Sequence, residues 1–442
     1  MSDTQKPARV TGHEDIAKLT DMLMHLDDLL VTCMRCGLCQ SVCPVYGATF
    51  READVTRGKI SLLENLARKV TEDADGVDVR LNRCLLCGSC EANCPSGVKI
   101  MDIFMHARSI IAGYLGLSFT KKMIFRGMLT HPGLFNSLLD ISSKFQGLFL
   151  RGANKDIGTS CAPLLNPLIG SRHFPALAKT PLRKTVQKLD TPAGSSGIKV
   201  ALFPGCVTDK IFPNVGTATL KVLEKHGVGV FMPSEVACCG IPAIASGDVA
   251  SYHKLAKMNA AIFAQGKFDY LLTPCATCAS TIKEVWPMMM NSDYTQAERT
   301  SIEAWHGKTM EISQFLVDVL KVQPTAGSDR KKRVTYHDSC HMRNSLKSRA
   351  QPRALLSDMP GYSFVEMPEA DRCCGSGGSF CLKHYDLAKN IGQRKRDNIV
   401  SVEPDVVTAT CPACMMQMMD MLSQNNDKIQ VKHLIELYAD TL

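Results

Sequence analysis

The sequence lacks the features that would place the chain in a membrane or outside the cell. No apolar run approaches the roughly 18 residues that a membrane-spanning helix needs. The polar N-terminus, residues 1–16, contains neither an apolar core segment nor the paired arginines of an export signal. We therefore expect a reducing, cytoplasmic location without a transmembrane segment, and attachment to the membrane surface stays open.

Signatures of nucleic-acid and nucleotide binding are absent as well. The formal net charge is +8, but the basic residues form no stripe with interleaved aromatic residues, so we expect no nucleic-acid partner. The run GSGGSF at residues 375–380 lacks the last glycine of a dinucleotide fingerprint, and it follows cysteines instead of opening a phosphate-binding turn. We therefore expect no flavin or nicotinamide in this chain.

Cysteine, by contrast, is abundant. The 442 residues, enough for two to four domains, contain twenty cysteines. Most of them lie in repeated patterns with the spacing of metal ligands. Cys161 and Cys381 lie outside these patterns, and we interpret both as small structural thiols; for Cys381 a substitute ligand or a redox role is the alternative.

Two cysteine runs lie in the N-terminal part, residues 15–150, whose apolar periodicity predicts helices. Each run has spacings of two, two and three residues and a trailing proline, as in bacterial ferredoxins with two cubane [4Fe–4S] clusters. A structural zinc site is the weaker alternative, because zinc ribbons lack the third cysteine. In such modules the fourth cysteine of each run crosses to the other cluster. The expected ligand sets are Cys33, Cys36, Cys39 and Cys94 for one cluster, and Cys84, Cys87, Cys90 and Cys43 for the other.

The C-terminal part repeats itself at a period of about 134 to 136 residues. Each copy alternates short apolar strands with helical segments, which predicts two pseudo-symmetric α/β domains with parallel sheets, at residues 199–330 and 331–442. Residues 151–198, rich in Pro, Gly and Ser, are interpreted as a surface connector. Each cysteine group of a copy follows the end of a predicted strand, so we expect five thiols to converge in each copy.

These repeated cysteines carry a family resemblance. The sets are Cys206, Cys238, Cys239, Cys275 and Cys278 in the first copy, and Cys340, Cys373, Cys374, Cys411 and Cys414 in the second. They resemble the cysteine-rich CCG domain of heterodisulfide reductases, of anaerobic glycerol-3-phosphate dehydrogenase and of glycolate or D-lactate oxidase iron–sulfur subunits. The motifs RCLLCGSCEANCPSGVKI, YHDSCHMRN, RCCGSGGSF and CPACMMQ are most similar to the glycolate and D-lactate oxidase subunits.

The resemblance implies a noncubane [4Fe–4S] cluster on such five-cysteine sets. Many glycolate-type relatives have lost the closing cysteines of the first copy, whereas Cys275 and Cys278 are both present here. Two alternatives stay open: both copies hold a noncubane cluster, or one copy holds a conventional cluster.

Several residues beside the cysteines are candidates for supporting roles. Glycines beside the cysteine pairs let the backbone turn tightly and aim N–H groups at cluster sulfur; they are Gly240, Gly375, Gly377 and Gly378. His337, Asp338 and His341 flank Cys340, and they are equally well interpreted as partners of the cluster or as turn residues. Residues 119–135 predict a helix with a solvated face, and a helix that binds a partner or a membrane surface is the alternative.

Many cluster sites without an organic cofactor site describe an electron relay. The resemblance implies the iron–sulfur subunit of a glycolate or D-lactate dehydrogenase, with FAD in a partner flavoprotein subunit and quinone or another carrier as electron acceptor. The alternative function is reduction of a disulfide at a noncubane cluster, as in heterodisulfide reductase. A zinc-bound scaffold without redox activity is the third hypothesis.

Overall fold

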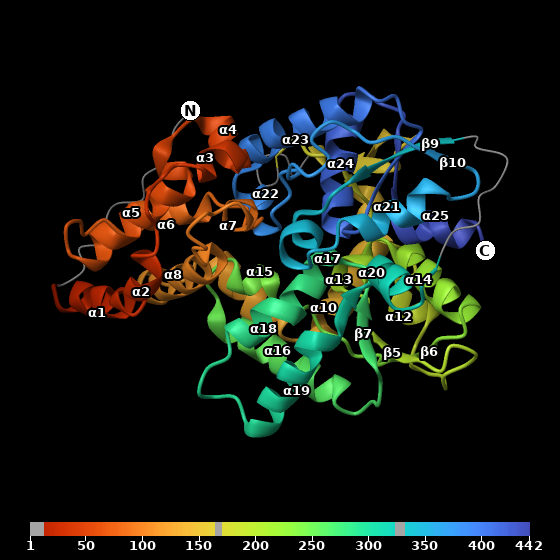
Figure 1. Ribbon diagram of the computed structural model, residues 1–442, viewed down its shortest axis with the longest axis horizontal. Helices are drawn as coiled ribbons and strands as arrows, with labels where there is room; N and C mark the ends of the chain where they lie inside the picture. Colours follow the sequence, from red (N-terminus) through yellow and green to blue (C-terminus); the bar gives the residue numbers. More distant parts are fainter. Residues whose placement is uncertain (1–12, 164–169, 323–331) are drawn as a thin grey trace.

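The helical character expected for the N-terminal part is present in the structure, a computed structural model that describes residues 13–163, 170–322 and 332–442. This helical region forms one end of the molecule (Figure 1). Its elements are α1 (His13–Met24), α2 (Asp27–Leu30), α3 (Cys39–Val42), α4 (Pro44–Thr49), the 3₁₀ turn η1 (Glu52–Asp54), α5 (Thr56–Ala67), α6 (Ala74–Asn82), α7 (Ser89–Ala92) and α8 (Ile100–Leu115).

The helices of this region are held by apolar packing and by caps at their ends. Ile60 and Leu63 of α5 and Phe104 of α8 are fully buried in one core. The Asp73 side chain caps α6 by accepting a hydrogen bond of 2.8 Å from the Gly76 N–H. The cysteine runs therefore lie in loops and in the short helices α3 and α7, beside a packed core that fixes them in place.

A second helical stretch follows α8 and leads away from the cysteine runs. It consists of α9 (Phe119–Lys122), the π-helical η2 (Met123–Leu129), α10 (Pro132–Phe145) and the 3₁₀ turn η3 (Gln146–Leu148). Within the described ranges, no helix has by itself the length and apolar composition to cross a membrane. One pair meets both limits together, α8 with α9–η2, and it is bent by 115°.

The segment interpreted as a connector contains a small antiparallel sheet, which its turn-rich sequence did not indicate. Its strands are β1 (Arg151–Asn154), β2 (Thr159–Cys161) and β3 (Phe174–Pro175), in the order β1-β2-β3. The sheet packs on α24 (Pro412–Gln424), where the His173 N–H donates a 2.7 Å hydrogen bond to Asp420. The segment then continues through α12 (Leu182–Thr185) to β4 (Leu189–Asp190), which joins the first large sheet.

The first large sheet has five strands in the order β4-β6-β5-β7-β8. Its remaining strands are β5 (Lys199–Leu202), β6 (Gly229–Met232), β7 (Tyr270–Thr273) and β8 (Thr309–Glu311). They are parallel, but β4 pairs antiparallel with β6, so this sheet is not wholly parallel as predicted. Around it lie α13 (Cys206–Lys210), α14 (Pro213–Lys225), α15 (Ile241–Ile244), α16 (Val249–Phe263), α17 (Ala276–Ser280), η5 (Thr281–Val285), α18 (Trp286–Met288), α19 (Gln296–Lys308) and α20 (Ile312–Asp318).

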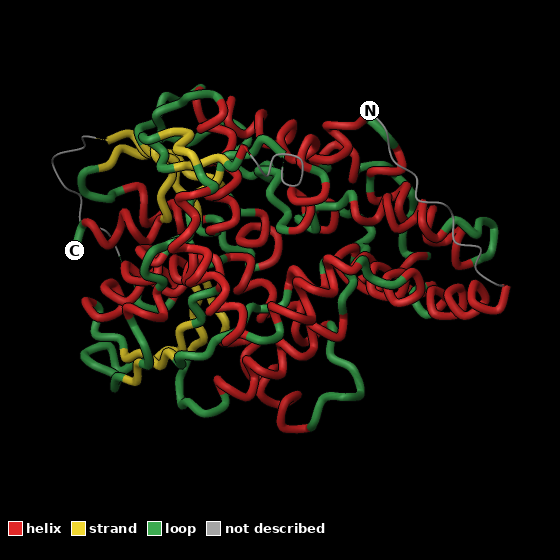
Figure 2. The backbone as a smooth tube through the Cα atoms, turned by 180° about the vertical axis from the view of Figure 1, so that it is seen from behind, coloured by secondary structure: helices red, strands yellow, loops and turns green. Residues whose placement is uncertain are grey.

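The second large sheet has four parallel strands in the order β10-β9-β11-β12. They are β9 (Lys332–His337), β10 (Tyr362–Phe364), β11 (Val406–Ala409) and β12 (Gln430–His433), and β11 is buried along its whole length. The helices are η6 (His341–Ser345), α21 (Ala350–Ser357), α22 (Ser379–Lys383), α23 (Tyr385–Val400), α24 and α25 (Leu434–Asp440). Seen from behind, the strands lie at the end of the molecule away from the N-terminus (Figure 2).

The strand order defines where ligands are expected. Among the parallel strands of each sheet, the first in the chain (β5 or β9) lies between the second and the third, so the connections leave it in opposite directions. Open α/β sheets bind ligands at this reversal, beyond the carboxyl ends of the strands. The strands that flank it are β5 and β7 in one sheet and β9 and β11 in the other, and each is followed within four residues by a cysteine.

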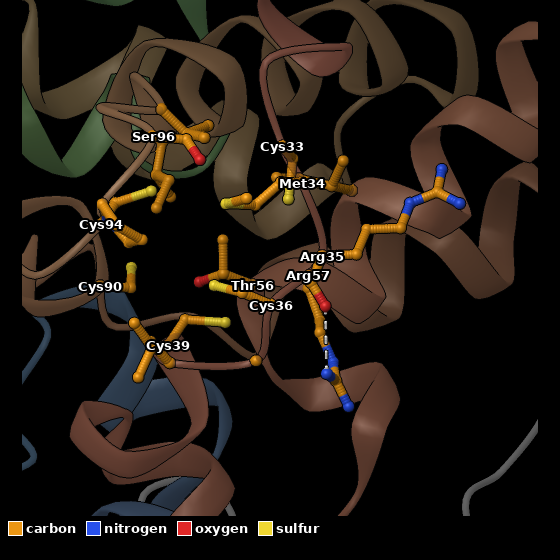
Figure 3. Close-up of a pocket in the computed structure, with 16 residues that line it drawn as sticks. Cys33, Met34, Arg35, Cys36, Cys39, Thr56, Arg57, Cys90, Cys94 and Ser96 are labelled. Atoms are coloured by element: carbon orange, nitrogen blue, oxygen red, sulfur yellow. Dashed lines mark hydrogen bonds between the residues drawn. The ribbon is translucent and has the colours of Figure 1, made fainter.

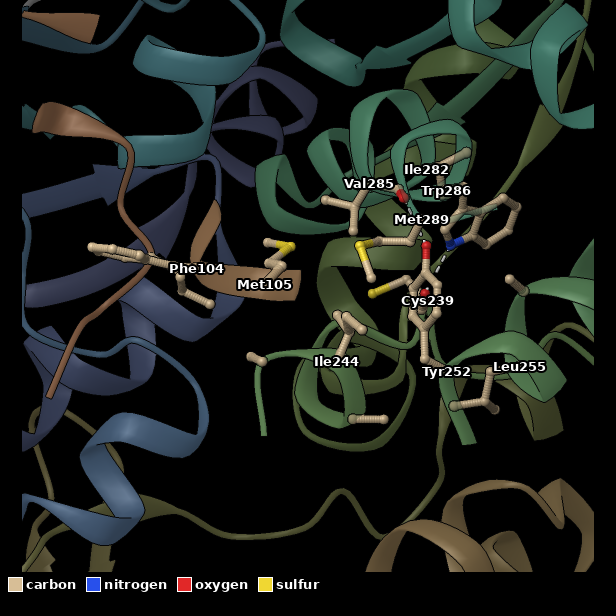
Figure 4. Packing of buried hydrophobic residues seen from close by; sticks show 14 of the residues in the cluster. Phe104, Met105, Cys239, Ile244, Tyr252, Leu255, Ile282, Val285, Trp286 and Met289 are labelled. Carbon is tan, nitrogen blue, oxygen red and sulfur yellow. Dashed lines mark hydrogen bonds between the residues drawn. The ribbon is translucent and has the colours of Figure 1, made fainter. Parts of the chain in front are cut away.

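The regions share their cores. One core joins the N-terminal helices to the helices of the first sheet, and Figure 4 shows Met105 of α8 between Phe104 and the group formed by Ile244 and Val285. A second core joins the two large sheets. α14 also packs on α25, where Lys221 donates a 2.6 Å hydrogen bond to the Ala439 carbonyl.

Candidate metal centres

The first site is a pocket near the surface of the N-terminal region (Figure 3). Cys36 is exposed at its rim, and Thr56 of α5 forms part of its wall. The thiols that line it belong to Cys33, Cys36, Cys39, Cys90 and Cys94. The fourth cysteine of the second run, Cys94, is thus grouped with the first three cysteines of the first run.

The second site lies deeper, on the other side of the same wall. Thr56, Cys90 and Ile100 line both pockets, so the two sites are direct neighbours. The thiols of the second site belong to Cys43, Cys84, Cys87 and Cys90. The fourth cysteine of the first run, Cys43, is therefore grouped with the second run.

Both cysteine runs have residues with positive φ, the left-handed backbone conformation, at matching positions. Arg35 and Leu86, two residues after the first cysteine of each run, have φ of 57° and 52°. The glycine after the second cysteine, Gly37 or Gly88, has φ of 87° or 71°. Left-handed residues reverse the chain within each CxxC turn, which brings the three thiols of a run to one side.

The five cysteines of the first α/β set converge beyond the strand ends. The Cys206 and Cys238 sulfurs are 3.9 Å apart. Cys239 contacts Cys238 and Cys278, and Cys275 contacts Cys278. Four of the five are buried, while Cys206 is partly exposed.

The second set repeats this arrangement with all five cysteines buried. Cys340 contacts Cys373, and Cys374 contacts Cys373 and Cys414. Cys411 contacts Cys414 as well.

Contacts between the thiols of a set favour the thiolate form at some cysteines, whereas contact with a neighbouring thiol and burial raise the pKa of others, such as Cys206 and Cys340. Contacts with Cys238 and Cys278 hold the pKa of Cys239 well below its usual value. Contacts with Cys373 and Cys414 do the same for the pKa of Cys374. The thiolate is the form that binds metal. Free thiols without disulfides, gathered in this number, are the donor set that soft metals and iron–sulfur clusters require, so the residues present fit such clusters.

Contacts between sites join all four into one series. Cys87 of the second site contacts Cys373 of the second α/β set. Asn344 of η6 strengthens this junction by donating a 2.8 Å hydrogen bond to the Cys87 carbonyl. Cys275 contacts Cys411, which links the two α/β sets, and the Thr277 hydroxyl lies 3.3 Å from the Cys411 sulfur.

The four candidate glycines all have positive φ. Gly240 and Gly375 have φ of 93° and 89°, and a Cβ there would lie 2.9 Å from Tyr252 and 2.7 Å from the Ala388 carbonyl. Gly377 is similarly crowded by Leu85, whereas Gly378 has free space beside it. These glycines allow the tight turn, but the space that three of them leave is filled by protein.

The three residues that flank Cys340 in the sequence, His337, Asp338 and His341, have different neighbours in the structure. His337 is buried, and its ring lies beside Cys374 and Cys414. His341 lies 3.0 Å from the Thr277 hydroxyl, at the junction of the two α/β sets. Asp338 turns away to a bidentate ion pair with Arg353, at 2.9 and 2.8 Å.

Of the two cysteines outside the repeated patterns, Cys381 packs against the buried residues that include Cys340 and Cys373, so it lies next to the second set. Cys161 is part of β2 in the small sheet. The Cys381 thiol donates a 3.1 Å hydrogen bond to the Gly378 carbonyl.

Three buried cations near the sites were not predicted from the sequence. Lys59 lines the second site and donates a hydrogen bond to the Asp54 carbonyl. Arg108 donates a 2.8 Å hydrogen bond to the Cys84 carbonyl, and Lys395 lies behind the Cys373–Cys374 pair. A cation at a buried position of an otherwise amphipathic helix was the only signal that could have revealed them.

Two family models agree with this arrangement. Residues 30–98 match the family model of a 4Fe-4S dicluster domain, and residues 200–283 and 334–419 both match that of a cysteine-rich domain named CCG. A crystal structure of a hypothetical protein from Helicobacter pylori aligns with 87% of this chain and 68% of its own, with a TM-score of 0.44 and 11% identity.

Curated relatives cover half or more of the chain. A probable glycolate oxidase iron-sulfur subunit of Bacillus subtilis is 30% identical over 93% of this chain and 94% of its own length. A fumarate reductase (CoM/CoB) subunit of Methanothermobacter marburgensis is 27% identical over 92% of this chain and 71% of its own. Lactate utilization protein A of an Exiguobacterium species is 34% identical over 54% of this chain and 96% of its own. The chain therefore belongs to the family of glycolate oxidase iron–sulfur subunits, with a 4Fe-4S dicluster domain followed by two matches to the cysteine-rich domain.

Proposed function

We propose that the chain is the electron-transfer subunit of a flavin-dependent dehydrogenase that oxidises glycolate or D-lactate. The observation that carries the proposal is the unbroken series of thiol groups, joined by the Cys87–Cys373 and Cys275–Cys411 contacts. A series of neighbouring sites that starts at the surface suits electron transfer better than catalysis at one isolated centre. The names of the relatives from Bacillus subtilis and Exiguobacterium support the substrate class.

We assign one cluster to each group of thiols. Cys33, Cys36, Cys39 and Cys94 would hold one cubane [4Fe–4S] cluster, and Cys43, Cys84, Cys87 and Cys90 the other. The two five-cysteine sets would hold one or two further clusters, of the noncubane type where all five bind. Such clusters supply one-electron reduction and oxidation. The same strand order around both sets supports the interpretation of residues 199–330 and 331–442 as two copies of one fold.

The electron balance requires two partners. Oxidation of a 2-hydroxy acid to a 2-oxo acid releases two electrons and two protons, which the FAD of a partner flavoprotein takes up together. This chain then accepts the electrons singly and passes them on, and a quinone or another carrier takes up two electrons with two protons. The exposed Cys36 site and the partly exposed Cys206 site are the two ends of the series.

A peripheral position on the cytoplasmic face of the membrane is the second part of the proposal. Free thiols throughout the chain suit a reducing compartment. Nine of the nineteen exposed large apolar side chains among the described residues lie between residues 119 and 149; we call these nine the apolar face. They are Phe119, Met123, Ile124, Leu134, Leu138, Ile141, Phe145, Leu148 and Phe149.

The charges around the apolar face favour lipid as its occupant. Exposed Lys122 and Lys144 flank the face, and the one acidic residue of the stretch, Asp140, is paired with Arg183 and Lys184. Apolar and cationic side chains together are the pattern of helices that lie on anionic membranes.

The position of α10 links this face to the redox sites. Its four exposed apolar residues, from Leu134 to Phe145, fall within about 60° of one another around the helix. Asn136, on the opposite side, lines the pocket beside Cys206. α10 thus carries part of the apolar face on one side and borders the pocket beside Cys206 on the other, which would place the acceptor end at the membrane. Figure 1 shows α10 near α13, the helix that begins at Cys206.

The test is reduction of the chain by its partner. The purified chain, loaded with iron and sulfide, is mixed with a flavoprotein dehydrogenase that glycolate or D-lactate has reduced, and electron paramagnetic resonance (EPR) follows the centres. We expect reduction of more than one centre and an iron content above that of two cubane clusters. No reduction of any centre would contradict the proposal, and a colourless protein without iron would support a zinc scaffold instead.

Reduction of a disulfide is the second candidate function, because all five cysteines are present in both α/β sets. A disulfide would take two electrons and two protons to give two thiols, with the electrons delivered singly from the reduced centres. The chain is reduced with dithionite, freed of excess reductant and mixed with organic disulfides. Disulfide-dependent reoxidation would favour this function, and the absence of reoxidation would exclude it for the disulfides tested.

A further inference from the structure

His337 is a buried histidine whose hydrogen bonds are not accounted for by the protein. It is the last residue of β9, it is fully buried, and neither ring nitrogen has a hydrogen-bond partner among the described residues. The Ala370 carbonyl lies near the ring but outside hydrogen-bond geometry, and it already accepts the Asp338 N–H at 3.0 Å and a Lys395 N–H at 3.2 Å. Buried polar groups without partners are costly and rare, so this one calls for an explanation.

Other histidines near the second α/β set are different. The Nδ1 of His341 lies 3.0 Å from the Thr277 hydroxyl, and the Nδ1 of His433 accepts the Ile435 N–H at 3.2 Å. The imidazole of His337 is fully buried, and in its neutral form such a ring offers one N–H donor and one acceptor. A neutral ring with an unused donor points to a partner that is not part of the polypeptide.

The thiols show where this partner would lie. A ring nitrogen of His337 and the sulfurs of Cys374 and Cys414 all lie within 4.8 Å of one another. No hydrogen bond joins the ring to either sulfur. The ring therefore faces the space that these two cysteines enclose, which is where the five-cysteine set would hold its cluster.

The first α/β set lacks this feature. Phe203 occupies the matching place, three residues before the first cysteine of its set, and its ring stacks on Phe263 with centroids 5.9 Å apart. An aromatic side chain thus fills the same place in both sets, but only His337 can donate a hydrogen bond. The second set therefore has a side-chain hydrogen-bond donor at a position where the first set has only an apolar ring.

We propose that the His337 imidazole donates an N–H hydrogen bond to a sulfur of the cluster held by Cys340, Cys373, Cys374, Cys411 and Cys414. This inference rests on the proposed function only in assuming that these cysteines hold an iron–sulfur cluster. A donor to sulfur stabilises the extra negative charge of the reduced state and so raises the reduction potential. His337 is then a positioning and tuning residue, with five thiolates already available as ligands.

The experiment replaces the donor and measures the potential of this one centre. In the full chain, His337→Phe gives the second set the residue of the first, and His337→Gln keeps an N–H donor. EPR redox titration is expected to show a decrease of about tenfold in the reduction equilibrium constant for His337→Phe, equal to about 59 mV for one electron, with substantial rescue in His337→Gln. Iron content is measured alongside, because a structural role would lower it.

A measurement on the unmodified protein covers the case in which His337→Phe does not assemble its cluster. Electron–nuclear double resonance in H₂O and in D₂O should show an exchangeable proton coupled to this centre. An unchanged potential in His337→Phe, or no exchangeable proton, would overturn the inference. A strong nitrogen coupling would overturn it too, because it would make His337 an iron ligand. If the unmodified chain forms no cluster here, the assignment of the cluster itself fails.

Discussion

Lys395 donates a hydrogen bond of 3.2 Å to the carbonyl of Ala370, three residues before the Cys373–Cys374 pair, and is only 1% exposed. Burial lowers the pKa of Lys395 to about 8, so at neutral pH the ammonium group is mostly charged. On the corresponding helix of the first set, Asn259 holds the start of the cysteine pair: it donates a 3.0 Å hydrogen bond to the Cys238 carbonyl and accepts the Ala237 N–H at 3.0 Å. The two sets therefore differ by one buried positive charge.

The first prediction follows from that charge. Lys395→Asn should lower the reduction potential of the second-set centre, because a buried cation stabilises the reduced and more negative state. EPR redox titration measures the shift. Lys389→Asn, at an exposed position of the same helix, is the matched control and should leave the potential nearly unchanged. Equal potentials in the unmodified chain and Lys395→Asn would show that this charge does not act on the centre.

The second prediction concerns the crossing of the fourth cysteines. Cys94 lines the exposed site and Cys43 lines the deeper one. Cys94→Ser should therefore remove or alter the EPR signal of the exposed centre and spare that of its neighbour, while Cys43→Ser should have the opposite effect. Cys161→Ser, in the small sheet, should keep the full iron content. If Cys94→Ser affected only the deeper centre, each run would hold its own fourth ligand.

The third prediction concerns Arg108, which joins the N-terminal helices to the first α/β region. Its guanidinium donates to the carbonyls of Leu81 at 2.5 Å, Cys84 at 2.8 Å and Ala245 at 2.7 Å. Arg108→Met would leave these carbonyls without their donor, and each buried unpaired group costs about 1–3 kcal/mol. We expect the free energy of unfolding to fall by about 3 kcal/mol or more in denaturant titrations followed by circular dichroism.

The exposed Arg51→Met is the control for this prediction, and it should change the free energy of unfolding by less than about 0.5 kcal/mol. Similar unfolding curves for Arg108→Met and the unmodified chain would mean that water or a local shift replaces the lost hydrogen bonds.

The sequence was sufficient for the features that depend on local order. The apolar segments that run up to Cys206 and Cys340 predicted parallel strands with thiols beyond their carboxyl ends, because strand periodicity and the geometry of parallel sheets are local rules. The strands end at Leu202 and His337, four and three residues before these cysteines. The cysteine spacings likewise predicted a dicluster domain, and the apolar periodicity around them predicted its helices. These features need no knowledge of how distant segments dock.

The features that the sequence did not reveal depend on packing between segments that are far apart in the chain. The strands at residues 151–175 are two to four residues long, and they are stabilised by contacts with α24, such as that of His173 with Asp420. The contact of Cys87 with Cys373 spans most of the chain in the same way. His337 could have been singled out by comparison with Phe203, since a histidine where the other copy has an apolar residue indicates a polar partner in a buried place.

The fourth prediction concerns membrane binding by the apolar face. Leu138→Glu with Ile141→Glu places two charges in the exposed stripe of α10 and should not disturb the core, because both side chains already face solvent. Burial of one such side chain contributes about 1.5–3 kcal/mol, so we expect binding to vesicles to weaken at least about tenfold. Sedimentation of the full chain with vesicles of phosphatidylcholine and phosphatidylglycerol measures this effect.

A matched pair of substitutions and a second lipid composition complete the test. Val70→Glu with Leu382→Glu adds the same charge at exposed apolar positions elsewhere and should leave binding unchanged. Lys122→Ser with Lys144→Ser should weaken binding to the anionic vesicles and have little effect with phosphatidylcholine alone. If the α10 variant instead converted a dimer to a monomer without any change in vesicle binding, the apolar face would be an interface between two copies of the chain.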